Sequence, residues 1–150
     1  MPQITVSTEV GAPIGVVFAF HLDPRNAARI SPRGTKVVSV EAPEQVRQGD
    51  EVRLAVRQFP SPFIQRWRVR IERVDEPFAV VDVALAGPFS EWRHEHLFAV
   101  AGEGRTLLTD HVTYGLPLGA LGTIADRLVI RRVLLWTFRA RQARTRSILG

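Results

Sequence analysis

The sequence predicts a single α+β domain, residues 1–150, in which an antiparallel sheet curves around a long C-terminal helix. Most of the chain before residue 115 consists of segments in which apolar and polar residues alternate with a period of two, as in half-buried strands. Turn-forming Gly and Pro residues separate these segments. From Thr123 to Leu149 neither residue type interrupts the chain, which predicts one helix of about seven turns.

The predicted elements follow the order strand, two short helices, further strands and the long helix. Residues 3–10 alternate as a half-buried strand, and Ala12-Pro13 opens a helix at a position where proline is tolerated. A second helical turn starts at residues 23–26 and ends before Pro32. The remaining strands are predicted at residues 35–41, after the turn at 48–50, after the kink at 60–62, and at 77–85, 89–100 and 105–114.

The clearest alternation lies after the kink, where three apolar residues alternate with three arginines. The apolar and the arginine sets are Trp67, Val69 and Ile71, and Arg66, Arg68 and Arg70, respectively. Successive side chains of a strand point to opposite faces of the sheet. This strand is therefore predicted to place its apolar residues in the interior and its arginines in solvent.

Composition and charge exclude several classes of protein. The chain has no cysteine, which rules out disulfides and thiolate chemistry. The net charge is +5, but residues 121–150 hold seven arginines and one acidic residue, so the rest is nearly neutral and we expect no nucleic-acid partner. The chain does not open with a basic segment followed by an apolar one, and no apolar stretch reaches the roughly 18 residues of a membrane span. We therefore expect a cytoplasmic protein.

The C-terminal helix carries a broad apolar arc and a narrower apolar stripe on the opposite side. The arc comprises Leu121, Ile124, Ala125, Leu128, Val129, Val133, Leu135, Trp136 and Ala140. We expect this arc to face the sheet, with Arg132 and Arg139 near its middle either reaching the rim of the fold or meeting a ligand carboxylate or phosphate. If the sheet covers only one side, the stripe of Ile130, Leu134 and Phe138 is left for a homodimer, partner or membrane contact.

Two stretches carry a resemblance to a known superfamily. The first is residues 12–26, APIGVVFAFHLDPRN, and the second runs from WRHEHLF at 92–98 through LTDHVTY at 108–114 and LPLG at 116–119 into the Arg-rich helix. These stretches and the order of elements resemble the START-like superfamily, also called SRPBCC or polyketide cyclase/dehydrase-like, and in particular a bacterial ligand-binding branch of it. The resemblance implies a helix-grip fold, with six to seven antiparallel strands curved around the C-terminal helix and a largely apolar ligand cavity between them.

Two histidines of the predicted strand at 89–100 are the main candidates for chemistry. His94 and His96 are two residues apart, so they share one face with Trp92 and Phe98. One hypothesis is that either histidine acts as a general acid or base in an apolar pocket. Another is a metal site of two histidines and a third His or Asp. We favour a third hypothesis, in which they pair with acidic groups or bind a ligand without chemistry, and we predict no metal and no cofactor.

The last predicted strand leaves its orientation open. Asp110, Val112 and Tyr114 share one face, whereas Thr109, His111 and Thr113 share the other. Alternation shows which residues belong together but does not show which set lines the cavity. If chemistry occurs, Tyr114 or an arginine such as Arg132 is the candidate for stabilising a developing oxyanion.

The sequence therefore predicts a domain that binds or carries a small hydrophobic ligand, such as a lipid, an isoprenoid, a quinone or a polyketide-like aromatic. The candidate ligand-binding residues are Trp67, Val69, Trp92, His94, His96, Phe98, Asp110, Tyr114, Leu128, Arg132 and Trp136. The alternative is a polyketide cyclase/aromatase or dehydrase that uses His94 or His96 as acid or base, with Tyr114 as its partner. A third hypothesis is an interaction module whose Arg-rich helix weakly contacts a partner or an anionic membrane.

Overall fold

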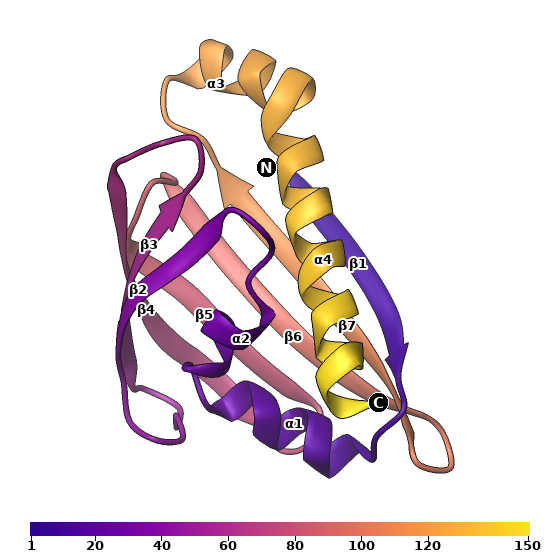
Figure 1. Ribbon diagram of the computed structural model, residues 1–150. Helices are drawn as coiled ribbons and strands as arrows, with labels where there is room; N and C mark the ends of the chain where they lie inside the picture. Colours follow the sequence, from indigo (N-terminus) through magenta and orange to yellow (C-terminus); the bar gives the residue numbers. More distant parts are fainter.

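A computed structural model describes all 150 residues and shows a curled antiparallel sheet with a long helix lying across it (Figure 1). The sheet has seven strands in the order β1-β7-β6-β5-β4-β3-β2. Their bounds are β1 Gln3–Val10, β2 Thr35–Glu41, β3 Glu51–Gln58, β4 Ile64–Asp75, β5 Ala79–Ala86, β6 Glu91–Gly102 and β7 Arg105–Gly115. Strands β2 to β7 pair with their neighbours in sequence, and β1 pairs with β7 at the far edge. This confirms the predicted α+β helix-grip architecture.

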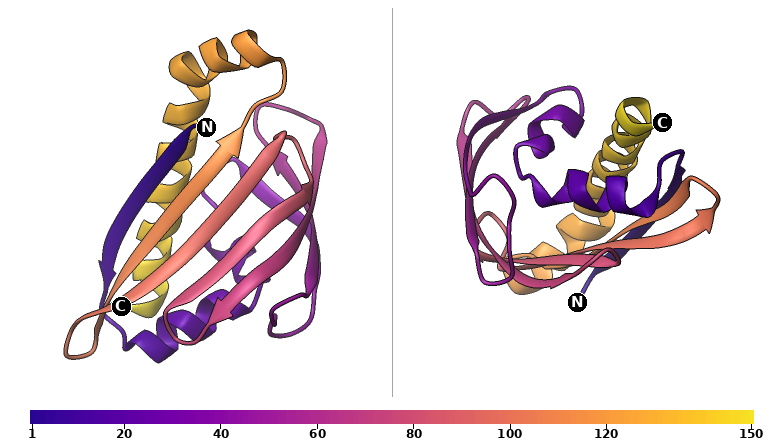
Figure 2. Two further views of the ribbon diagram at one scale, coloured as in Figure 1. Left: turned by 180° about the vertical axis from the view of Figure 1, so that it is seen from behind. Right: turned by 90° about the horizontal axis from the view of Figure 1, so that it is seen from below.

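Helices lie on the concave side of the sheet. Two short helices follow β1, α1 at Ile14–Leu22 and α2 at Asn26–Ile30. The C-terminal helical segment comprises α3 at Gly119–Ala125, a π-helical turn η1 at Asp126–Ile130, and α4 at Arg131–Leu149. Figure 2 shows the sheet curling around α1 and α4, while α3 and η1 project past the end of the sheet in Figure 1. None of these helices combines the length and the apolar character that crossing a lipid bilayer requires.

The predicted alternation in β4 is confirmed. Trp67, Val69 and Ile71 pack in the interior, and the arginines between them are exposed. Val69 and Ile71 belong to a core cluster that also holds Phe18 of α1 and Phe98 of β6. Hydrophobic burial of this kind is the main favourable term in folding, so this cluster holds α1 against the curved sheet.

The C-terminal helix is rotated relative to the prediction. Leu134 and Phe138 are only 9% and 4% exposed, because they pack on Ile4, Val112 and Tyr114 of the sheet. The prediction that Ile130, Leu134 and Phe138 form a homodimer contact is therefore wrong. The buried face of α4 continues through the polar side chains of Gln142 and Thr145. Its apolar part alone is narrow, and for this reason the pattern of apolar residues predicted the wrong side.

Much of the predicted apolar arc faces solvent instead. Five residues of it form what we call the outer apolar face, and each is more than half exposed: Leu121, Ile124, Leu128, Val129 and Trp136. The π-helical turn contributes to this result, because one extra residue in a turn rotates the flanking segments by roughly 100° relative to an unbroken α-helix. The first two of these residues belong to α3, which projects past the end of the sheet in Figure 1.

Candidate functional site

Four ionisable side chains meet on the concave face at the middle of β5, β6 and β7. We call Asp82, His94, His96 and Asp110 the His–Asp cluster. The strand register sets Asp82 opposite His94 and His96 opposite Asp110. Because side chains alternate along a strand, the two histidines share one face, and the neighbouring strands bring one carboxylate to each side of them.

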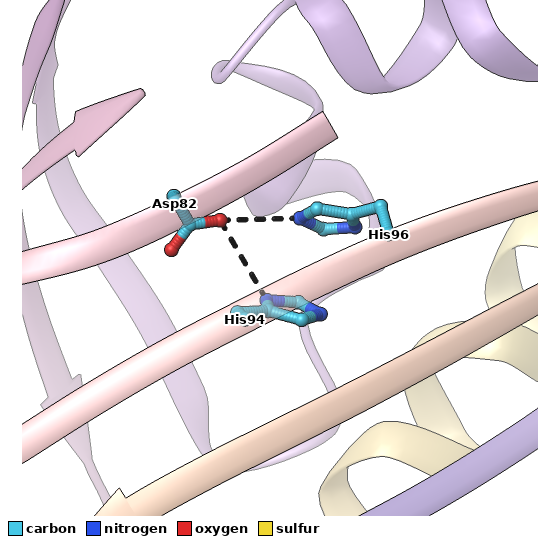
Figure 3. Close-up of side chains that lie close together, drawn as sticks. All are labelled: Asp82, His94 and His96. Carbon is cyan, nitrogen blue, oxygen red and sulfur yellow. Dashed lines mark hydrogen bonds and ion pairs between the residues drawn. The ribbon is translucent and has the colours of Figure 1, made fainter. Parts of the chain in front are cut away.

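Each histidine lies between the two carboxylates. His94 Nε2 is 2.7 Å from Asp110 Oδ1, and His96 Nε2 is 3.3 Å from Asp82 Oδ2. On their other sides, His94 Nδ1 lies 3.8 Å from Asp82 Oδ2 and His96 Nδ1 lies 3.4 Å from Asp110 Oδ1. Figure 3 shows how Asp82 faces both imidazole rings. Only the first two contacts have hydrogen-bond geometry, so His96 Nδ1 is a buried nitrogen without a hydrogen-bond partner.

Helices α1 and α4 cover the cluster with further polar groups. Gln142 Nε2 donates to Asp110 Oδ2 and to the carbonyl oxygen of Val6, both at 2.8 Å, and so ties α4 to the cluster and to β1. His21 Nδ1 donates to the Val17 carbonyl at 2.8 Å, and its ring centre lies 5.3 Å from that of His96. These contacts hold Asp110 and His21 in place.

The charges of the cluster follow from opposing effects of burial and contact. Burial lowers the pKa of His94, and burial likewise lowers the pKa of His21 to about 3, so both rings are neutral near pH 7. Burial also acts to lower the pKa of His96, but Asp110 and Asp82 outweigh it and raise the pKa to about 9. His96 is therefore the protonated histidine of the cluster.

Burial acts to raise the pKa of both aspartates, but the histidines reverse this. Contacts with His94 and His96 hold the pKa of Asp110 well below its usual range. Contacts with the same two rings also lower the pKa of Asp82. Both side chains are carboxylates at neutral pH, in a part of the protein from which water is largely excluded.

Arg141 of α4 is the one cation near the cluster that has no partner of its own. Its guanidinium lies 5.5 Å from the ring centre of Phe138 and makes no hydrogen bond or ion pair. Burial lowers the pKa of Arg141, while Asp110 and Asp82 act in the opposite direction, which places this side chain within the electrostatic reach of both carboxylates. Five N–H donors on Arg141 are thus left available in a half-buried position.

Aromatic rings form a wall between the cluster and the end of β6 near α3. Trp92 lies 4.9 Å from Phe89 and 5.1 Å from Trp67 between ring centres, and 6.4 Å from the ring of His94. Tyr114 contacts Phe89 on the other side. Its hydroxyl donates to Asp126 of η1, and burial followed by this contact raises the pKa of Tyr114. The Tyr114 hydroxyl is thereby committed to η1 and not to the histidines.

The structure places eight predicted site residues on the inner face: Trp67, Val69, Trp92, His94, His96, Phe98, Asp110 and Tyr114. Asp110, Val112 and Tyr114 are the set of β7 that faces inward, and His111 lies on the outer face, where its Nδ1 is 2.7 Å from Thr5 Oγ1. Leu128, Arg132 and Trp136 do not join the site. Arg132 and Trp136 line a shallow groove of about 430 Å³ on the exposed side of α4.

Five residues of the site were missed by sequence reasoning: His21, Asp82, Phe89, Arg141 and Gln142. Asp82 had a usable signal, because it is the single charge within the apolar run of β5 and a lone charge in a buried strand needs a partner. His21 follows Phe18 and Phe20 in an apolar helix and had a similar but weaker signal. The sequence carries no such signal for Arg141 and Gln142, because they are two polar residues among many in α4.

A wider groove opens at the other end of the molecule. It measures about 1170 Å³ and lies between α1, residues 43–48 and the end of β4. Phe18 and Leu22 of α1 form part of its apolar lining. The ring of Phe18 packs on Phe98, and Phe98 packs on His21. This groove is therefore separated from the cluster by only a few side chains.

No protein-family model and no curated protein sequence matches the chain, but solved structures match its fold. TTHA0849 from Thermus thermophilus aligns with a TM-score of 0.78 at 17% identity over 97% of this chain and 95% of that one. A START superfamily protein from Mycobacterium smegmatis aligns with a TM-score of 0.73 at 12% identity over 98% of this chain and 96% of that one. The di-domain ARO/CYC StfQ from the steffimycin biosynthetic pathway aligns with a TM-score of 0.76 at 15% identity over 98% of this chain and 50% of that one.

Proposed function

The chain has the START-like helix-grip fold, and we propose that it uses the concave face of the sheet to bind a small hydrophobic molecule with one polar or anionic group. The apolar body of the ligand would contact the aromatic wall of Trp67, Phe89 and Trp92. Its polar group would accept hydrogen bonds from Arg141. Lipids, isoprenoids, quinones and polyketide-like aromatics all combine these two features.

The observation that carries this proposal is the unpaired guanidinium of Arg141 beside buried charges and aromatic rings. Replacing a buried ion pair by apolar residues is often neutral or stabilising, so stability alone does not explain a buried His–Asp cluster. A half-buried arginine without a partner is suited to a carboxylate, phenolate or carbonyl oxygen. Aromatic and apolar walls with a few orienting polar groups are typical of small-molecule sites.

The wider groove near α1 is the proposed route for the ligand. Its lining includes Phe18 and Leu22, and Phe18 leads through Phe98 to His21 and the cluster. Rotation of one or two of these side chains would connect the groove with the interior. Phe18 and Phe98 are only 1% and 3% exposed, so this would take a local opening of the packing around them, without rearrangement of the sheet.

Fluorescence titration with 1-anilinonaphthalene-8-sulfonate, an apolar aromatic anion, tests this proposal. We expect Arg141→Met and Trp92→Ala each to weaken binding at least tenfold, in line with the loss of a charge-assisted hydrogen bond or a large aromatic contact. Trp136→Ala is the matched control, since Trp136 lies on the outer apolar face and its loss should leave the affinity unchanged. Equal affinity in the wild type, Arg141→Met and Trp92→Ala would refute binding at this site.

One contact favours a second function, a cyclase/aromatase or dehydrase activity. Asp110 lies 2.7 Å from His94 Nε2 and is itself held by Gln142, which is how a carboxylate orients a histidine that acts on a substrate. A polyketide-like substrate consumed by the wild type but not by His94→Gln would support this function. Unchanged turnover in His94→Gln and His96→Gln would exclude it.

The outer apolar face supports the proposal of a weak contact with anionic membranes. Its five apolar residues lie on a helical segment whose 121–150 portion holds seven arginines and one acidic residue, and this charge complements an anionic surface. Binding to phosphatidylserine vesicles that weakens as salt is raised would support the contact. Binding equal to that of neutral vesicles would contradict it. We also propose that the protein is located in the cytoplasm, as expected from the sequence.

A further inference from the structure

We propose that Asp82, His94 and His96 bind one divalent first-row transition-metal ion, such as Zn²⁺, through one carboxylate oxygen and two imidazole nitrogens. The three ligand atoms all lie within 4.8 Å of one another. They come from adjacent strands of a hydrogen-bonded sheet, and Figure 3 shows Asp82 facing both rings. This inference is independent of the hydrophobic ligand proposed above.

The separations of the ligand atoms suit a metal with short bonds. Four-coordinate Zn²⁺ binds nitrogen and oxygen at about 2.0–2.1 Å, which puts neighbouring ligand atoms of a tetrahedron about 3.3 Å apart. Asp82 Oδ2 lies 3.3 Å from His96 Nε2 and 3.8 Å from His94 Nδ1. The third separation, between the two imidazole nitrogens, is at most 4.8 Å, so side-chain shifts of about 1 Å or less would close the site around an ion.

The opposite edges of both rings face a second carboxylate. A histidine that binds a metal through one nitrogen usually donates the N–H of its other nitrogen to a carboxylate or carbonyl group. His94 Nε2 lies 2.7 Å from Asp110 Oδ1, and His96 Nδ1 lies 3.4 Å from the same oxygen. Gln142 in turn donates to the other oxygen of Asp110. One carboxylate thus orients both candidate ligands, and the buried His96 Nδ1 would gain a partner once the ring adjusts.

The chemistry of the donors selects the kind of ion. Imidazole nitrogen suits Zn²⁺, Fe²⁺, Ni²⁺ and Cu²⁺, whereas Mg²⁺ and Ca²⁺ prefer all-oxygen sites. Two carboxylates against the single charge of Arg141 leave the site negative when both histidines are neutral ligands. Three protein ligands leave at least one coordination position for a solvent molecule or a ligand oxygen, as in catalytic zinc sites.

Metal titration of tag-free, chelator-treated protein tests the site, with Zn²⁺ measured by calorimetry and Co²⁺ by its visible absorption. We expect one ion per chain and an absorption spectrum of a four- or five-coordinate ion with mixed nitrogen and oxygen ligands. Asp82→Asn and His94→Gln should each lower the affinity at least 100-fold. Asp110→Asn should lower it 10- to 100-fold, because Asp110 acts through the two ligands. His111→Gln is the matched control on the outer face and should leave the affinity unchanged.

Circular dichroism and thermal unfolding keep the test valid where a variant is less stable. Zn²⁺ should raise the Tm of the wild type and of His111→Gln but not that of a folded His94→Gln. Failure of the wild type to bind a stoichiometric ion would overturn the proposal, as would equal affinity in Asp82→Asn. When the fluorescent anion is titrated into chelator-treated protein, its binding does not depend on a metal, so failure of the metal site would leave the ligand proposal standing. Metal bound to both rings would in turn exclude them as the free acid or base of a cyclase.

Discussion

The His–Asp cluster and the outer apolar face invert the usual distribution of residues between core and surface. The cluster places two carboxylates and two histidines in the middle of the sheet, with His94 and Asp110 only 5% and 6% exposed and the other two largely buried. The outer apolar face instead leaves Leu128 65% and Trp136 51% exposed. Burying charges costs free energy, and exposing large apolar side chains forgoes the gain of burial.

Both regions are candidates for function, but for contacts of different kinds. Apolar residues in place of a buried ion pair are often as stable or more so, and exposed apolar side chains add little to stability, so we interpret both regions as places of contact with something outside the chain. The buried region offers directed polar groups to a small molecule or an ion. The exposed region offers apolar area beside positive charge to a surface.

Removing a carboxylate of the cluster should have the largest effect on stability. Asp110→Ala leaves His94, His96 and Gln142 without their shared partner, and breaking a buried pair in this way costs about 3–5 kcal/mol. Urea unfolding measures the loss. Glu72→Ala is the control, since Glu72 forms a half-exposed ion pair with Arg93 that contributes at most about 1 kcal/mol. Equal losses in the two variants would show that the cluster is not buried as described.

A pair of substitutions on α4 tests the rotation of the helix. Phe138→Ala should destabilise the protein by about 3 kcal/mol, because Phe138 packs on Trp92, His94 and Leu134 in the interior. Trp136→Ala should change the free energy of unfolding by about 0.5 kcal/mol or less, since Trp136 faces solvent. Chemical denaturation of both variants measures the two losses of unfolding free energy. A larger loss for Trp136→Ala would restore the orientation that the apolar arc predicted.

The attachment of η1 to the sheet should have a moderate effect. Tyr114→Phe removes the hydrogen bond to the buried Asp126 and leaves that carboxylate without this donor, at a cost of about 1–3 kcal/mol. Thermal unfolding followed by circular dichroism measures this loss of stability. An unchanged Tm would mean that solvent satisfies Asp126 and that η1 is not anchored by Tyr114.

Polar substitutions on the outer apolar face should have the smallest effect on stability. Leu128→Ser combined with Trp136→Ser should change the free energy of unfolding by no more than about 1 kcal/mol, because both side chains are exposed. The same double variant should lose binding to anionic vesicles, measured by cosedimentation. A strongly destabilised double variant would show that this face is part of the core of the isolated chain.

Much of the fold could be predicted because it depends on neighbouring residues. The alternation around Trp67 and Val69 predicted which side of β4 is buried, and the structure confirms it. His94 and His96 had to share a face for the same reason. The interruption-free run after Thr123 predicted a terminal helix, although the structure starts it at Gly119 and includes a π-helical turn.

Only the tertiary structure shows which residues make up the site. Asp82, His94 and Asp110 lie on three different strands and meet only because the sheet pairs them in one register. Gln142 joins them from a helix that crosses the sheet near the end of the chain. No local pattern specifies such a register, which depends on contacts between distant segments.

The order of the elements, the two faces of each strand and the proximity of His94 and His96 are therefore encoded locally, because they follow from the geometry of successive residues. The tertiary structure alone decided which face of β7 points inward, which side of α4 meets the sheet and which carboxylates reach the histidines. Those choices depend on packing and hydrogen bonds between segments far apart in the chain. A helix with two apolar sides, such as this one, acquires an inside and an outside only when the sheet closes around it.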